Sequence, residues 1–96
     1  MNYYIEVDGI PVVSTFQEWA VWFNAADRTI KKTDTSNYWV STVFIGMCGV
    51  IYETMVFPYD SMIDERCVRS STKEAALQAH NDLVREFQPS PLDILD

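Results

Sequence analysis

The residues of this sequence that could do chemistry are few, and they lie within apolar stretches. Ser41, Thr42, Glu53 and Thr54 interrupt a run of β-branched and aromatic residues, and His80 is the only histidine. A hydroxyl, a carboxylate and an imidazole in mutual contact could serve a small hydrolase or transferase, with Glu53 and His80 as its central pair. The alternative is a cross-strand ladder of hydrogen bonds with His80 packed beside it, and we favour this structural interpretation.

Other catalytic patterns are absent from the sequence. It has no Gly-rich phosphate loop and no nucleophile elbow. Cys48 and Cys67 are far apart and form no CxxC pair, and a lone histidine cannot supply two metal ligands. We therefore predict no metal and no cofactor, and we expect both cysteines to be reduced thiols in a cytosolic protein.

The charge of the chain favours binding to a basic protein. Fourteen acidic residues against seven basic ones give a net charge of −7, which would repel phosphate backbones and anionic lipids. We therefore expect no direct contact with nucleic acid or membrane. Acidic side chains would engage lysine and arginine on a partner, and an exposed aromatic would anchor the contact. The predicted binding residues are Tyr59, Asp60, Asp64, Glu65, Asp82 and Glu86.

These residues must be positioned by a central hairpin, residues 38–57. Its two halves are dense in β-branched and aromatic residues and flank a break at Gly46–Gly49. Both faces of each half are substantially apolar, which predicts helices on one face and partial cover on the other. Glu53 is the exception, and we favour a position facing solvent over burial against Arg66 or Arg69.

The remaining elements complete an α+β domain. Asp8-Gly9 predicts a small N-terminal hairpin at a sheet edge. Apolar spacing predicts helices over about 15–30 and 72–87, and residues 66–70 alternate as an edge strand does. We predict a two-layer domain, an antiparallel sheet of about four to five strands packed by two helices.

The length of 96 residues suits a single domain over 1–88. Residues 89–96 follow a Pro-rich stop and are expected to form a C-terminal tail, with strand-edge docking as the alternative. The first residues have neither a basic nor a long apolar stretch, and no apolar run is long enough to span a bilayer. We therefore expect a cytoplasmic protein.

Four segments carry a resemblance to known sequences. They are the aromatic helix around Trp19–Phe23, the Val40–Phe44 strand with Gly46, the Glu53–Phe57 strand and the helix that contains His80. The chain resembles a family of short, largely uncharacterised proteins of bacteriophages, prophages and bacteria. Members commonly have an Asp-His pair and a Gly/Pro-rich loop between the two strands, and this chain lacks both. The resemblance implies an origin in a phage or mobile element.

These observations predict a non-enzymatic protein-binding module. In a phage setting it would be an inhibitor of a host defence or nucleic-acid-processing complex, as anti-CRISPR proteins are. One alternative is a homodimeric structural or assembly protein, formed through an exposed strand edge or an uncovered sheet face. The second alternative is the small hydrolase or transferase that would use Glu53 and His80.

Overall fold

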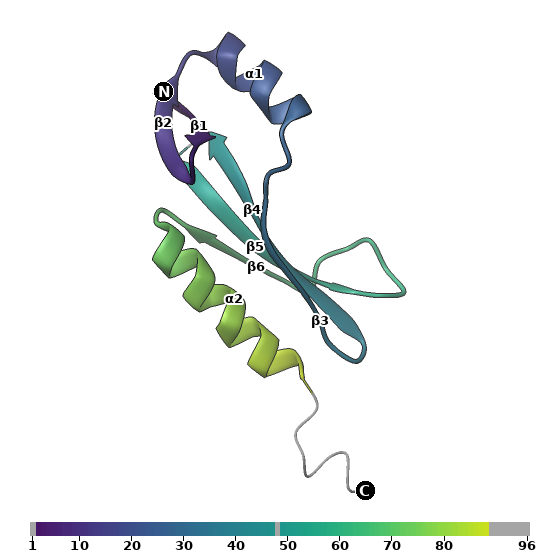
Figure 1. Cartoon of the computed structure of the whole chain (residues 1–96). Coiled ribbons are helices and arrows are strands. Elements are labelled where there is room, and N and C mark those ends of the chain that lie inside the picture. The colour runs from purple at the N-terminus through teal and green to yellow at the C-terminus, as the bar shows by residue number, and fades with distance from the viewer. Residues whose placement is uncertain (1, 48, 89–96) are drawn as a thin grey trace, which may run out of the picture.

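A computed structural model describes residues 2–47 and 49–88, which form an α+β fold (Figure 1). A four-stranded antiparallel sheet in the order β3-β4-β5-β6 packs against α2, and a separate hairpin, β1-β2, lies at one end with α1. The predicted fold class is confirmed. The elements are β1 Tyr3–Val7, β2 Ile10–Ser14, α1 Phe16–Ala25, β3 Thr29–Asp34, β4 Tyr38–Met47, β5 Val50–Pro58, β6 Arg66–Ser70 and α2 Lys73–Phe87.

The N-terminal hairpin forms where the turn residues predict it. Asp8 and Gly9 both have positive φ angles, 52° and 80°, as a two-residue hairpin turn of the primed type requires. The expected place at the edge of the main sheet is wrong, because β1 and β2 form a two-stranded sheet of their own. Pro11 lies in β2, whose only strand partner within the described chain is β1, so its missing N–H interrupts no ladder on the open side.

Helix α1 is shorter than predicted. It begins as expected with a capping box, in which Thr15 and Glu18 bind each other's backbone N–H groups. It ends at Ala25 rather than near residue 30, because the chain pairs with β4 from Thr29 onward. The strand β3 was not predicted. Lys31 and Lys32 therefore lie on an edge strand, where lysine protects against unwanted pairing, and not in the last turn of a helix.

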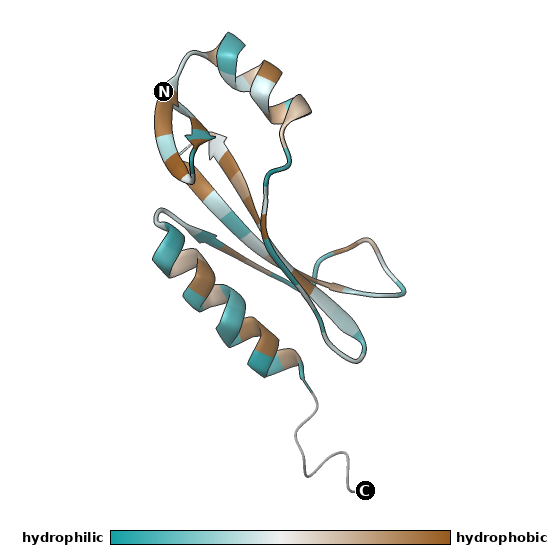
Figure 2. Ribbon diagram, in the orientation of Figure 1, coloured by the Kyte–Doolittle hydropathy of each residue, from teal (hydrophilic) through white to brown (hydrophobic). Residues whose placement is uncertain are grey.

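The central hairpin has one buried and one half-exposed face. Alternate residues of β4 and β5 point toward α2 and are almost fully buried, as the alternation predicts. Their opposite neighbours are half-buried, and Trp39 stacks on Phe57 there with ring centroids 4.5 Å apart. Figure 2 shows the matching alternation of apolar and polar residues along α2. Its buried residues are Ala76, His80 and Leu83.

The core is divided into two apolar clusters. One surrounds Val40, Val56 and Leu83, and the other surrounds Phe44, Tyr52 and Ala76. Trp22 joins the second cluster edge-on to Phe44, which ties α1 to the same core that α2 covers. Between the clusters lie the three buried polar side chains, Thr42, Thr54 and His80.

Gly46 allows the N-terminal hairpin to approach β4 closely. The pairing of β4 with β5 shifts register between Phe44 and Met47, and Gly46 lies in this irregularity with a φ of +73°. A Cβ at Gly46 would stand 2.1 Å from the carbonyl oxygen of Tyr4. Only glycine fits this backbone conformation at this distance.

Replacing Gly46 with alanine should destabilise the protein much more than replacing Gly49. Gly49 also has a positive φ, +76°, but a Cβ there would meet no atom within 4 Å. We expect Gly49→Ala to lower the free energy of unfolding by about 1 kcal/mol, the cost of the left-handed conformation. Gly46→Ala should cost at least about 2 kcal/mol more, because the backbone of Tyr4 must move. Urea unfolding measures both losses, and equal losses would contradict the close approach.

Candidate functional site

Four of the six predicted binding residues lie together on one loop. Residues 59–65 join β5 to β6, and we call them the β5–β6 loop; it projects away from the sheet in Figure 1. Tyr59, Asp60, Asp64 and Glu65 are all exposed there. Backbone hydrogen bonds order both ends of the loop, from Ser61 to the Pro58 carbonyl (3.2 Å) and from Glu65 to the Val56 carbonyl (2.8 Å). Its acids are thus presented on a structured projection.

Tyr59, at the base of this loop, is held by a hydrogen bond to another strand, β3. Its hydroxyl donates to the carboxylate of Asp34, at the end of β3. This hydrogen bond, followed by partial burial and the charge of Asp34, raises the pKa of the Tyr59 phenol. Tyr59 is 57% exposed, so a partner could contact this residue while its hydroxyl stays bound.

The other two predicted residues, Asp82 and Glu86, are exposed on α2 but are already paired. Glu86 Oε1 accepts from Arg66 at 2.5 Å, which links α2 to β6. Asp82 accepts from Gln78 at 2.9 Å and from Arg85. Asp82 and Glu86 are therefore paired with arginines of the chain itself, whereas the acids of the loop form no ion pair among the described residues.

Sequence reasoning missed two residues at the tip of the loop. Met62 is 86% exposed and Ile63 is 77% exposed, among the largest values for apolar side chains in the described chain. The signal was present in the sequence, where two neighbouring apolar residues stand among acids between the predicted strands 38–57 and 66–70. Solvent exposure of such a pair marks a contact surface more strongly than the acids alone.

The structure does not bring Glu53 to His80. Glu53 lies on the half-exposed face of β5, where its Oε2 accepts from Arg69 Nε at 3.2 Å. Its neighbour Thr54 points the opposite way, toward α2 and His80. The favoured prediction of a position facing solvent is wrong, because the Glu53 side chain is only 15% exposed and is paired with Arg69, as the alternative prediction had it. The geometry required for joint catalysis by Glu53 and His80 is not formed.

His80 joins three strands through a chain of hydrogen bonds. Its Nδ1 lies 2.8 Å from Thr42 Oγ1, and its Nε2 lies 2.8 Å from Thr33 Oγ1. Thr42 Oγ1 lies 2.7 Å from Thr54 Oγ1 on the neighbouring strand. We call these four residues the Thr–His chain. The predicted cross-strand ladder is present, and Thr33, on the unpredicted strand β3, is the member that sequence reasoning missed.

The environment of His80 favours its neutral form. The side chain is fully buried, and burial, followed by the positive charge of Lys31, lowers the pKa of the imidazole. A neutral ring can accept at one nitrogen and donate at the other, which suits two hydroxyl partners. Within residues 2–47 and 49–88, no group of three or more His, Cys, Asp or Glu side chains is arranged to hold a metal ion.

Cys67 is a free and exposed cysteine on β6. Partial burial, followed by the negative charge of Glu53, raises the pKa of its thiol. A raised pKa keeps the sulfur protonated and weakly nucleophilic at neutral pH. Cys48 and the predicted tail, residues 89–96, lie outside the described residues. Among the helices described, none has the length and apolar character needed to cross a membrane.

Below about pH 6.5 the protein should lose stability because of its single histidine. The native pKa of His80 is lowered from 6.5, so the unfolded chain takes up the proton first as the pH falls. The contribution of His80 is therefore complete above pH 6.5 and is lost toward its lower native pKa. We expect a loss of at most about 1.4 kcal/mol per pH unit in urea unfolding.

His80→Gln is the control for this effect, since no other side chain has an ordinary pKa between about 5 and 8. The variant should show a flatter dependence of stability on pH over that interval. In the native protein, the NMR signal of the imidazole should titrate below pH 6.5. Titration at or above that pH, or equal slopes in both proteins, would contradict the argument.

Comparisons with known protein families, with curated proteins and with solved structures found no match in any of the three. The resemblance to phage-encoded proteins therefore stays a prediction. The functional argument rests on the geometry of the chain itself.

Proposed function

We propose that this protein is a non-enzymatic binding module that contacts a partner protein through the β5–β6 loop. The partner surface would combine an apolar pocket with surrounding lysine and arginine side chains. Met62 and Ile63 would enter the pocket, and Asp60, Asp64 and Glu65 would face the basic rim. This pattern of an apolar centre and a charged rim is the usual anatomy of a protein interface.

The observation that carries the proposal is the exposure of Met62 and Ile63, 86% and 77%, between acidic neighbours. Two adjacent apolar side chains in water gain free energy when a partner covers them. The neighbouring carboxylates attract a basic partner and raise the association rate. Asp64 and Glu65 form no ion pair within the described chain, so their charge is available to a partner.

The distance between Glu53 and His80, the two groups considered for catalysis, supports a non-enzymatic role. Glu53 is paired with Arg69 on one face of the sheet, while His80 is buried on the other with both ring nitrogens bound to threonines. The raised pKa of Cys67 also argues against a thiolate nucleophile.

The resemblance to phage-encoded proteins extends the proposal to the class of partner. In that setting the module would act in the host cytoplasm as an inhibitor of a defence or nucleic-acid-processing complex, comparable to anti-CRISPR proteins. Such complexes expose basic surfaces that bind phosphate backbones, and an acidic loop on a chain of net charge −7 is complementary to them. The same charge disfavours direct binding of nucleic acid or an anionic membrane.

Removing the acids of the loop should weaken partner binding, whereas removing those of α2 should not. Asp64→Asn with Glu65→Gln and Asp82→Asn with Glu86→Gln each remove one aspartate and one glutamate. The partner is first captured from bacterial lysate with the unaltered protein, and its affinity for each variant is then measured. We expect the loop variant to bind at least about fivefold more weakly at low salt, mainly through slower association. Equal effects of the two double variants would show that only overall charge matters and would contradict the proposal.

The apolar tip should contribute more to affinity than its charged rim. We expect Met62→Ser with Ile63→Ser to weaken binding by at least about tenfold, mainly through faster dissociation. Val21→Ser is the matched control, because Val21 is 72% exposed on α1, outside the loop. Retention of full affinity by the tip variant, or an equal loss in the Val21 variant, would remove the loop as the contact.

A second proposal, from a different class, is a homodimeric assembly protein. Exposed apolar side chains also occur in the N-terminal hairpin and α1, and a symmetric contact between two copies would cover them. The most exposed are Ile10, Val13, Phe16 and Val21. Light scattering during sizing chromatography should then give twice the chain mass, and Val13→Glu should give the monomer. A monomer for the unaltered protein at every concentration contradicts this second proposal.

A further inference from the structure

We propose that the hollow between β3 and α2 binds a small oxyanion, a carboxylate or a phosphate, through Lys31, Thr33 and Asn81. This site is separate from the β5–β6 loop and does not depend on the function proposed for that loop. The hollow has a volume of about 410 Å³, within the usual range for small-ligand sites. The residues that line it are Lys31, Thr33, Gln78, Asn81, Val84 and Arg85.

The first argument comes from the direction of hydrogen bonding in the Thr–His chain. Thr54 Oγ1 is fully buried and, among the described residues, bonds only to Thr42. A buried hydroxyl hydrogen needs an acceptor, so Thr54 donates to Thr42 and Thr42 must donate onward to Nδ1 of His80. The ring hydrogen is then on Nε2 and is donated to Thr33. The opposite arrangement would leave the Thr54 hydrogen without a partner.

The consequence appears at the surface end of the chain. Thr33 Oγ1 accepts from His80, so its own hydrogen is free to point into the hollow that Thr33 lines. A buried and neutral imidazole thus turns the Thr33 hydroxyl into a donor. The Thr–His chain supplies the hollow with a directed hydrogen and no negative charge.

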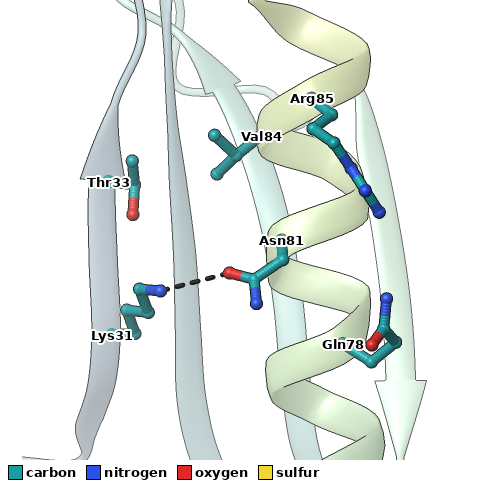
Figure 3. A pocket seen from close by; sticks show the side chains of 6 residues that line it. All are labelled: Lys31, Thr33, Gln78, Asn81, Val84 and Arg85. Carbon is teal, nitrogen blue, oxygen red and sulfur yellow. Dashed lines mark hydrogen bonds between the residues drawn. The ribbon is translucent and has the colours of Figure 1, made fainter.

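The second argument is the state of Lys31. Figure 3 shows Lys31 and Asn81 pointing toward each other, and Lys31 Nζ donates to Asn81 Oδ1 at 3.1 Å. No carboxylate of the described chain lies within 4.0 Å of the Lys31 ammonium group. In a chain with twice as many acids as bases, a cation that rests on a neutral amide retains its charge for an external anion.

Asn81 completes the set of donors. Its oxygen is occupied by Lys31, so its amide nitrogen presents hydrogens and no acceptor. The groups at the rim agree with this polarity, because Arg85 and Gln78 both donate to the carboxylate of Asp82 and thereby occupy it. A ligand with several acceptor oxygens, a negative charge and few donors matches an ammonium, a hydroxyl and an amide hydrogen.

The test is an NMR titration of the uniformly ¹⁵N-labelled protein with sodium phosphate and, separately, with sodium acetate, at constant ionic strength set by chloride. We expect saturable shifts at Lys31, Thr33 and Asn81 for at least one of the two anions. Shifts with phosphate alone identify a phosphate site, and shifts with acetate identify a carboxylate site. Absence of saturable shifts at these residues with both anions overturns the proposal.

Matched variants distinguish anion binding at this site from a general effect of positive charge. Lys31→Gln and Lys32→Gln remove the same charge from neighbouring residues, but the Lys32 ammonium lies 4.9 Å from the ring centroid of Trp39. We expect Lys31→Gln to weaken binding by about tenfold and Lys32→Gln to leave it nearly unchanged. Asn81→Asp keeps a partner for Lys31 but replaces donors with acceptors, and it should abolish binding. Equal effects of the two lysine variants overturn the proposal.

The tautomer of His80 gives an independent check. The ¹⁵N chemical shifts of the imidazole at neutral pH should show hydrogen on Nε2. Hydrogen on Nδ1 would make Thr33 donate to the ring instead of into the hollow, and this result overturns the proposal. Loss of partner binding in the variants of the β5–β6 loop would leave these measurements unchanged, so the two proposals can fail separately.

Discussion

The structure depends on the need of one buried imidazole for two hydrogen-bonding partners. His80 is placed by α2 in the middle of the core, where an unpaired polar group would cost several kcal/mol, of the order of 2–7. Thr42 and Thr54 must therefore stand opposite each other on β4 and β5, and Thr33 must lie on β3 opposite Val40, where its hydroxyl reaches the other ring nitrogen. This requirement sets the register of three strands and the position of α2 along them. The apolar clusters on either side add stability, but apolar contacts tolerate sliding and the hydrogen bonds do not.

The fold keeps two kinds of surface apart. The acidic and apolar β5–β6 loop extends from one pair of strands, while the donor-rich hollow lies between the opposite edge strand, β3, and α2. Alternation along β3 contributes to this division, since Lys31 turns toward α2 and Lys32 toward Trp39 on the other face. A chain with a strong net negative charge can thus present a local positive site, because the potential near a group is set by its neighbours as well as by the total charge.

Sequence patterns predicted those helices, strands and turns that are determined by the residues within them. The Asp8-Gly9 turn, the alternation of β4 and β5, and α2 follow from local chemistry and periodicity. Strand β3 could not be predicted, because Lys31 and Lys32 read as the end of a helix until β4 is available to pair with them. The candidate site shows the same limit. The pairing of Glu86 with Arg66 arises only when α2 packs beside β6. The pairing of Asp82 with Arg85, by contrast, has the i,i+3 spacing of a single helix and was open to sequence reasoning.

The close approach at Gly46 also bears on how the molecule moves. The N-terminal hairpin and α1 are anchored to a short stretch of β4, where Tyr4 meets Gly46 and the indole of Trp19 donates to the Ile45 carbonyl at 3.0 Å. Arg28 adds a hydrogen bond to the Phe44 carbonyl at 3.0 Å. Because these contacts gather at one end of the sheet, we expect the first two dozen or so residues to open as one unit while the Thr–His chain stays closed. Protection of backbone amides from hydrogen exchange should then rise along β4 from Gly46 toward the pairing of Thr42 with Thr54.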